Sequence, residues 1–284
     1  MEFQNYLKNN AQQIEKKLEK ILSDFLNDTK QTNLALLPFA KEFIKSCKGG
    51  KRIRGVLVKL GYEVGRFDYS LPSTVEVRSR KSEDILKISA AFEILHTSLL
   101  IHDDIIDQSP KRRGIPSLFK ALGGNHYGIS QAITLGDIGL YLPLKIILET
   151  RFEDKYKLKA LKHFSQILIN TGWGQVMDVS PKSRDKAFID LYKTAKYTIS
   201  GPMQIGAILA GADDKLIKNL SEFGDNLGIA FQIKDDILDL EGGSIKEAEK
   251  YASKAKKMIR DITKDQKITE VLESMTEYVV GRTN

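Results

Sequence analysis

The sequence predicts an all-helical protein, a bundle of about ten helices that forms a single domain over residues 1–284. Three observations predict this class. Apolar residues recur at intervals of three and four, convincing strand-like alternation is absent, and glycine or proline clusters fall between the periodic segments. A bundle of this length buries a large core and can hold a deep central cavity between its helices.

Six segments carry the helical periodicity. The first repeats an apolar side chain at Ile14, Leu18 and Leu22, with lysine and glutamate between them. The segments, in chain order, are residues 11–26, 83–101, 155–169, 185–198, 214–240 and 245–262. Their separators, which are typical of helix ends, are Gly49-Gly50, Ser109-Pro110, Gly114 to Pro116, Gly123-Gly124, Ser180-Pro181 and Gly242-Gly243. A polar stretch near residues 66–82 is expected to be a loop.

The composition indicates a soluble protein. Hydrophobic residues make up 42% and charged residues 29%, which disfavours both disorder and a membrane-embedded chain. The uncharged run over residues 197–212 is shorter than the roughly 20 residues of a membrane-spanning helix, and the start of the chain lacks a signal-peptide pattern. The single cysteine, Cys47, excludes an internal disulfide and favours a reducing compartment. We therefore expect a cytoplasmic protein without a membrane span.

The net charge of +7 is compatible with several anionic partners. Nucleic acid, an acidic membrane surface or an anionic small substrate would each suit a basic protein. A lysine-rich solvated surface explains the same excess equally well, so the motifs must decide.

Two segments share the pattern D-D-x-x-D, each at the end of an apolar helical stretch. The aspartates are Asp103, Asp104 and Asp107 in the first motif and Asp235, Asp236 and Asp239 in the second. The first and last aspartate of each motif share a helix face, and carboxylates this close repel unless a cation neutralises them. Oxygen ligands of this kind suit Mg²⁺. A lone motif would more often be a solvated helix end, but two copies favour facing clusters that hold Mg²⁺ and one strongly anionic group.

Basic residues accompany the acidic motifs. Gly49-Gly50-Lys51-Arg52-Ile53-Arg54 opens a helix, where backbone N–H groups and basic side chains favour a phosphate. Arg112 and Arg113 follow the first motif within one loop, and Lys193, Thr194 and Lys196 lie on a later helix. Each could be a solvated charge, but together they indicate a second anion site beside the metal cage.

At these residues the sequence resembles the trans-isoprenyl diphosphate synthases, of the geranylgeranyl or polyprenyl type. The ordered motifs G-G-K-R-x-R, E-x-x-H-T-x-x-L-x-H-D-D-x-x-D, R-R-G, G-Q-x-x-D, K-T and F-Q-x-x-D-D-x-x-D match that family from about residue 45 to 240. The resemblance implies the isoprenoid synthase fold, a homodimer, and Mg²⁺-dependent condensation of isopentenyl diphosphate with an allylic diphosphate.

The resemblance also implies a role for each motif residue. Isopentenyl diphosphate would be bound by Lys51, Arg54, His96 and Arg113. About three Mg²⁺ ions would be held by Asp103, Asp104, Asp107, Asp235, Asp236 and Asp239. Arg112 would contact the allylic diphosphate. The leaving group and the cationic intermediate would be stabilised by Lys193, Thr194 and Gln232, with Gln175 and Asp178 behind them. The residues closest to catalysis would be Asp103, Asp107, Lys193 and Asp235.

Two positions bear on what such an enzyme would make. Ser98, five residues before the first aspartate, stands where the family's short-product enzymes carry a bulky aromatic residue, so we expect a product of about twenty carbons or longer. After Asp239 the chain passes almost directly to residue 245, whereas the family pattern continues for a few dozen residues that include a lysine at the second metal site. A natural deletion, an engineered deletion or the omission of a loop from the sequence would each produce this short connection. Lys234 or Lys246 could replace the missing lysine.

Three alternatives follow from the same residues. A non-catalytic or regulatory subunit would retain the fold and pair with an active partner, and the missing segment is its support. A terpene cyclase shares the helical fold and one aspartate motif, but it needs no isopentenyl site. A nucleic-acid-binding protein is disfavoured because acidic clusters would repel phosphate without metal.

Overall fold

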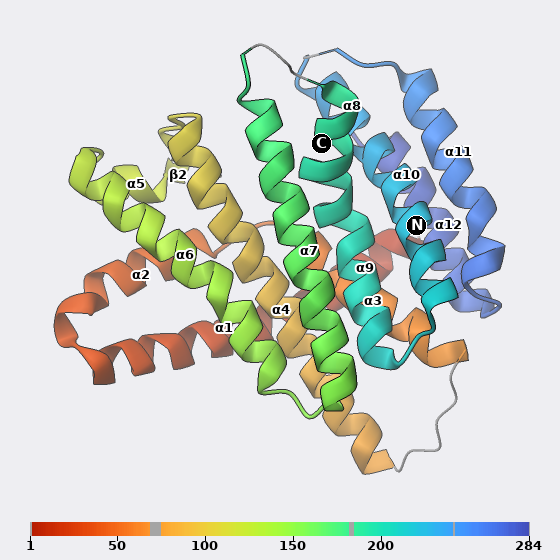
Figure 1. Ribbon diagram of the computed structural model, residues 1–284, viewed down its shortest axis with the longest axis horizontal. Helices are drawn as coiled ribbons and strands as arrows, with labels where there is room; N and C mark the ends of the chain where they lie inside the picture. Colours follow the sequence, from red (N-terminus) through yellow and green to blue (C-terminus); the bar gives the residue numbers. More distant parts are fainter. Residues whose placement is uncertain (1, 69–74, 182–184, 241, 284) are drawn as a thin grey trace. The chain divides into compact units, whose positions relative to one another are not determined.

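The structure is a computed structural model that describes residues 2–68, 75–181, 185–240 and 242–283. Helices account for nearly all of its regular structure, so the predicted all-α class is confirmed (Figure 1). The elements are α1 (Glu2–Thr32), η1 (Leu34–Leu36), α2 (Leu37–Ser46), α3 (Ile53–Asp68), α4 (Val75–Ile106), β1 (Lys111–Arg112), β2 (Ile115–Pro116), α5 (Leu118–Ala121), α6 (His126–Leu148), α7 (Asp154–Asp178), α8 (Lys186–Ile189), η2 (Asp190–Ser200), α9 (Gly201–Ala210), α10 (Asp214–Leu238), α11 (Ile245–Ile262) and α12 (Gln266–Gly281).

The chain forms two compact units. One consists of residues 1–10, 56–81 and 152–284, and the other of residues 11–55 and 82–151. We call the first the C-terminal unit, because residues 152–284 make up most of it, and the second the N-terminal unit, although residues 1–10 belong to the first. The first aspartate motif belongs to the N-terminal unit and the second to the C-terminal unit. That the two motifs face one another stays a prediction, as does the single domain over residues 1–284.

Apolar stripes build the core of the N-terminal unit. Ile14 and Leu18 of α1 are at most 1% exposed, as are Phe43 of α2 and Phe92 of α4. Burying a side chain of this kind contributes about 1.5–3 kcal/mol. Close to the first motif, α4 touches α6 at small residues: a Cβ added to Gly139 would lie 1.9 Å from the Ser98 hydroxyl oxygen. Glycine at this position therefore lets the two helices approach.

In the C-terminal unit, η2 packs against both α7 and α10. Glycines make this contact close, because a Cβ on Gly174 of α7 would lie 2.4 Å from the backbone nitrogen of Lys193. On the other side, a Cβ on Gly228 of α10 would lie 2.5 Å from the Cα of Ala195. In this way η2, which carries the K-T motif, is held between two helices.

The local structure differs from the sequence-based expectations at several positions. Residues 66–68 and 75–82 of the expected loop are helical, and 69–74 lie outside the described residues. Charged residues are good helix formers, so a helix can continue without an apolar stripe. Residues 190–200 wind as a π-helix, and a two-residue hairpin pairs Lys111 with Pro116. Trp173, the single tryptophan of the chain, is 61% exposed on α7 and is not part of the core.

Two helices within the described residues are long and apolar enough to cross a membrane, judged by length and composition alone. They are Arg80–Ile106 and His126–Leu148, and 67% and 39% of their most apolar windows are buried. Buried core helices of soluble proteins pass the same test, so this is weak support for a span. The expected absence of a membrane span stays a prediction.

Candidate active site

The first aspartate motif ends α4, and its three carboxylates face different surroundings. Asp104 is 3% exposed and accepts hydrogen bonds from Nε and Nη2 of Arg112 at 2.8 and 2.5 Å. Asp103 is half-buried and lies 3.7 Å from the same guanidinium, whereas Asp107 is exposed. Burial raises the pKa of Asp104, and the Arg112 charge partly offsets that rise. The motif therefore has a buried, paired middle member and two outer members that are more accessible.

The loop before α3 and the β1–β2 hairpin are joined by an arginine. Arg113 donates from Nη1 to the carbonyls of Lys48 and Gly49, both at 3.0 Å. Gly49 and Gly50 have φ of +76° and +99°, a left-handed conformation that favours glycine. The predicted phosphate-binding loop is thus held against the loop that carries Arg112 and Arg113.

A buried glutamate that the sequence analysis left without a role lies beneath this loop. Glu93 is 3% exposed, and its Oε1 accepts the Gly55 N–H at 2.7 Å. Burial raises the pKa of Glu93, although Gly55 and the charges of Arg54, Arg52 and Arg113 oppose the rise. The available signal was the first letter of the E-x-x-H motif, since three residues along a helix bring Glu93 and His96 to one face.

Arg52 also has a structural position in this cluster. It is 3% exposed, donates from Nε to Glu15 at 2.5 Å and from Nη2 to the Cys47 carbonyl at 3.0 Å, and lies 3.9 Å from Glu93. Its φ of +56° is uncommon for a residue with a side chain. A buried arginine with these partners anchors the loop rather than pointing into solvent.

His96 is neutral in this setting. Burial lowers its pKa well below the usual value, and the charges of Arg54, Arg113, Arg112 and Arg52 lower it further. The structure thus brings His96 near Arg54 and Arg113, three of the four residues expected to bind isopentenyl diphosphate, while Lys51 is exposed. A neutral imidazole can donate one N–H to a phosphate oxygen while the arginines supply the charge.

The second aspartate motif ends α10 and is paired differently. Asp236, the middle member, is 6% exposed and accepts from Lys186 at 2.6 Å and from Gln232 at 2.7 Å. Asp235 lies 2.6 Å from Nη2 of Arg282, and burial raises the pKa of Asp235 while Arg282 lowers it. Asp239 is the exposed C-cap of α10.

The cations that contact this motif in the described part of the chain are therefore Lys186 and Arg282. Sequence reasoning named Lys234 and Lys246 instead and missed both contacting residues. No sequence signal was available, because Lys186 and Arg282 lie far from the motif along the chain.

The K-T motif is connected to the second aspartate motif. Thr194 donates to Oε1 of Gln232 at 2.9 Å, and Gln232 in turn donates to Asp236. Lys193 donates to Asp178 at 2.6 Å. Sequence reasoning grouped Lys193, Thr194 and Gln232 with Asp178, and the structure brings all four together within the C-terminal unit. Lys196, by contrast, pairs with Asp225 at 2.9 Å.

The donor set fits Mg²⁺ at both motifs. Each motif offers two outer carboxylates separated by four residues on a helix, and Mg²⁺ takes one or two carboxylates while water and substrate phosphates complete its octahedron. Within the described ranges, no three aspartate, glutamate, histidine or cysteine side chains gather as a metal site. The assignment of individual metal ligands stays a prediction.

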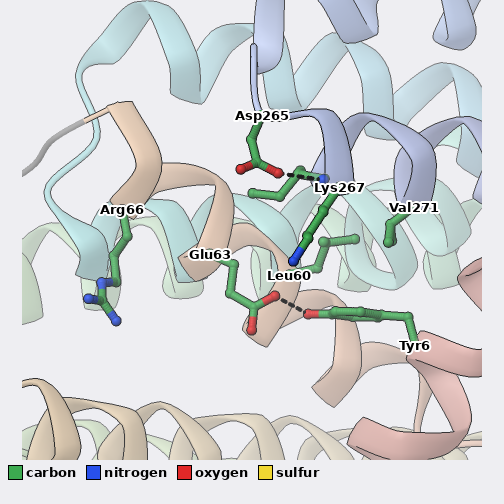
Figure 2. Close-up of a pocket in the computed structure, with 8 residues that line it drawn as sticks. Tyr6, Leu60, Glu63, Arg66, Asp265, Lys267 and Val271 are labelled. Atoms are coloured by element: carbon green, nitrogen blue, oxygen red, sulfur yellow. Dashed lines mark hydrogen bonds between the residues drawn. The ribbon is translucent and has the colours of Figure 1, made fainter.

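A separate cavity of about 480 Å³ lies in the C-terminal unit where α1, α3 and α12 meet (Figure 2). Its wall includes the Tyr6 hydroxyl, which donates to Glu63 at 2.6 Å, together with Leu60 and Lys267. None of the predicted site residues lines it.

Comparison with known proteins identifies the family of this chain. Residues 38–278 match the family model for polyprenyl synthetase. The chain is 32% identical over 200 residues to the geranylgeranyl diphosphate synthase of Sulfolobus acidocaldarius, an alignment that covers 68% of this chain and 55% of that protein. It is also 32% identical over 210 residues to the farnesyl diphosphate synthase of Geobacillus stearothermophilus, covering 70% and 64% respectively. The chain thus spans less than two thirds of the length of both curated relatives.

The fold is similar to the crystal structure of geranylgeranyl pyrophosphate synthase from Corynebacterium glutamicum complexed with isoprenyl diphosphate and magnesium. The TM-score is 0.79, and the match covers 94% of this chain and 98% of that one. At 19% identity this likeness shows the shared all-α fold alone. The family model, by contrast, matches most of the chain and confirms the resemblance drawn from the motifs. This chain belongs to the polyprenyl synthetase family.

Proposed function

We propose that this chain is a Mg²⁺-dependent prenyltransferase of isoprenoid biosynthesis that condenses isopentenyl diphosphate with an allylic diphosphate. The observation that carries the proposal is that the first aspartate motif and a group of arginines lie together within the N-terminal unit. Arg112 is bonded to Asp104, and its charge acts on His96 together with those of Arg54 and Arg113. Carboxylates for a metal and cations for a diphosphate therefore occupy one connected region.

Each group of residues has a stated task in this reaction. Mg²⁺ held by Asp103 and Asp107, and by Asp235 with its motif, would offset the charge of the departing diphosphate. Arg54, Arg113 and neutral His96 would hold the diphosphate of isopentenyl diphosphate and orient its double bond.

The residues of η2 and α10 would act on the other substrate. Lys193 and Thr194 would stabilise the leaving diphosphate as the allylic carbocation forms, and attack by the double bond followed by proton loss gives the longer product. Gln232 fixes the Thr194 hydroxyl by accepting a hydrogen bond from it at 2.9 Å. No side-chain nucleophile is required.

We propose further that the product has about twenty carbons or more. Ser98 is fully buried against Gly139, so the α4–α6 contact is built from two small residues where a bulky side chain would obstruct a chain descending beside α4. The names of the two curated relatives, one farnesyl and one geranylgeranyl, span both sides of this boundary.

We also propose a cytoplasmic homodimer. In the N-terminal unit, α6 leaves Tyr127, Tyr141 and Leu148 at least 54% exposed on one face of the helix, and an apolar patch on one face is typical of a partner surface. A second copy is the occupant that the family resemblance implies. An inactive subunit of a heteromeric enzyme is the second candidate, and the short connection after Asp239 favours it. There Leu240 has φ +61° and is 92% exposed.

The test is product formation by the purified chain. It would be incubated with Mg²⁺, labelled isopentenyl diphosphate and, separately, dimethylallyl, geranyl or farnesyl diphosphate, and the products would be sized by chromatography. We expect a Mg²⁺-dependent series that ends at one length. Asp103→Ala should abolish it, whereas the control Asp24→Ala, an exposed aspartate of α1 in the same unit, should not. A folded chain that elongates no primer would contradict the proposal and direct the search to a partner subunit.

A further inference from the structure

Arg282, which follows α12, is bound to the second aspartate motif on α10. Its side chain is 6% exposed, and Nη2 lies 2.6 Å from Asp235 and 2.9 Å from the carbonyl oxygen of Phe231. The guanidinium carbon stands 3.8 Å from the centre of the Phe231 ring, a cation–π contact. Three contacts therefore fix the end of α12 on α10, and only one of them uses the charge of Asp235.

The ion pair uses one oxygen of a carboxylate to which a metal at this motif would bind. Mg²⁺ binds carboxylate oxygens at about 2.0–2.1 Å, so a guanidinium on the same carboxylate would place two positive groups side by side. The Asp235 side chain is 35% exposed while Arg282 is buried, so the carboxylate is open to solvent on the side away from the arginine.

The pairing is also incomplete on the arginine's side. Among the described residues, the Nε of Arg282 is buried without a hydrogen-bond partner. A buried donor without an acceptor weakens the docked state of its side chain. The contact to Asp235 is thus formed by a cation that another cation can replace.

We propose that Arg282 is the counter-ion of Asp235 in the metal-free protein, and that Mg²⁺ arriving with a diphosphate replaces it and releases the segment after α12 from α10. The inference rests on the proposed function, because it assumes that the second motif binds a metal. Arg282 is in this view a positioning residue, which holds Asp235 until the metal arrives. Metal loading of α10 and docking of α12 are then coupled.

A spin label on Thr283, next to Arg282, tests the release directly. Thr283 is exposed, and a Thr283→Cys variant can be labelled selectively because the only other thiol, Cys47, is 1% exposed and burial raises its pKa to about 12. Addition of Mg²⁺ with inorganic pyrophosphate should increase label mobility. In an Asp235→Asn background, which removes the charge but leaves both contacts to Phe231, the label should be more mobile from the start and should respond less to Mg²⁺. The matched control Arg260→Met, which removes an exposed arginine of α11, should respond as the wild-type background does.

Calorimetry provides a second measurement on the unlabelled protein. An ion pair that competes with the metal should weaken binding by roughly fivefold, so Arg282→Met should bind Mg²⁺ with pyrophosphate about fivefold more tightly. Arg260→Met should leave the affinity unchanged. If Arg282→Met does not fold, Arg282→Lys can be used instead. It retains the charge and should therefore give a smaller gain in affinity for Mg²⁺ with pyrophosphate.

The outcomes separate this inference from the proposed function. A label that stays immobile while calorimetry shows saturation would overturn the inference, as would an unchanged affinity in Arg282→Met, even in a chain that makes prenyl products. Wild-type protein that binds no Mg²⁺ with pyrophosphate and elongates no primer would overturn both. Product formation with the expected mobility change would support both.

Discussion

Glu93 offers the sharpest test of how the basic cluster is held together. The carboxylate is 3% exposed, accepts the Gly55 N–H at 2.7 Å and lies 3.9 Å from Arg52. Glu93→Gln keeps an oxygen for Gly55 and removes a charge that burial disfavours, so it should change the free energy of unfolding by no more than about 1 kcal/mol. Glu93→Ala removes both and leaves a buried N–H and a buried cation unsatisfied, so the loss should be about 3–5 kcal/mol.

Circular dichroism of the helices during urea denaturation measures both losses of stability. In thermal unfolding of a chain of this size, each kcal/mol of lost stability should lower the melting temperature by about 2–4 °C. Glu19→Gln, an exposed glutamate on α1, is the matched control and should change neither quantity beyond about 0.5 kcal/mol. Equal losses in Glu93→Gln and Glu93→Ala would refute the reasoning, because the hydrogen bond to Gly55 would then contribute nothing.

The pH dependence of this difference has a defined sign. Burial raises the pKa of Glu93 above its ordinary 4.5, so the folded protein holds this proton more tightly than the unfolded chain does. The stability due to Glu93 is therefore greatest below pH 4.5 and decreases as the pH rises through the folded-state pKa. Glutamine does not titrate. The stability of the wild-type protein relative to Glu93→Gln should accordingly be greatest at acid pH and fall toward neutrality, and a wild-type advantage that grows with pH would contradict the assignment.

Three further outcomes are expected. Arg54→Gln should raise the pKa of His96, measured by NMR titration, because the Arg54 charge adds to burial in lowering it; an unchanged pKa would mean that burial acts alone. Gly228→Ala should destabilise the protein by about 1–3 kcal/mol in urea and lower kcat, since the added Cβ would lie 2.5 Å from the Cα of Ala195; normal stability would show that η2 can shift freely. Ser98→Phe should shorten the product sized by chromatography, and an unchanged length would exclude this position from length control.

The sequence was sufficient for the helical class and for residues that are neighbours along one helix. The four-residue spacing of Asp103 and Asp107 is a property of helical geometry, so it could be read without a structure. The partners of these residues could not, because they depend on packing. Lys186 reaches Asp236 of α10 from α8. Arg282 reaches Asp235 of α10 from the end of α12. The π-helical winding of η2 likewise leaves no mark in the apolar periodicity.

In both aspartate motifs the middle aspartate has different surroundings from the two outer ones, which the sequence pattern alone does not reveal. In both, the middle aspartate is buried and bound to a cation: Asp104 to Arg112, and Asp236 to Lys186. Helical rotation explains this, because residue i+1 is turned about 100° away from the face that i and i+4 share. The middle carboxylate therefore points into the protein, where it needs a counter-ion, whereas the outer carboxylates are more exposed, although Asp235 also pairs with Arg282. The alternative of a solvated helix end, which two copies of the motif already disfavoured, therefore does not describe the middle residue at either site. Asparagine at the middle position should lower stability without metal present, whereas asparagine at an outer position should lower metal affinity first, and comparing unfolding in EDTA with calorimetry in Mg²⁺ and pyrophosphate separates the two roles.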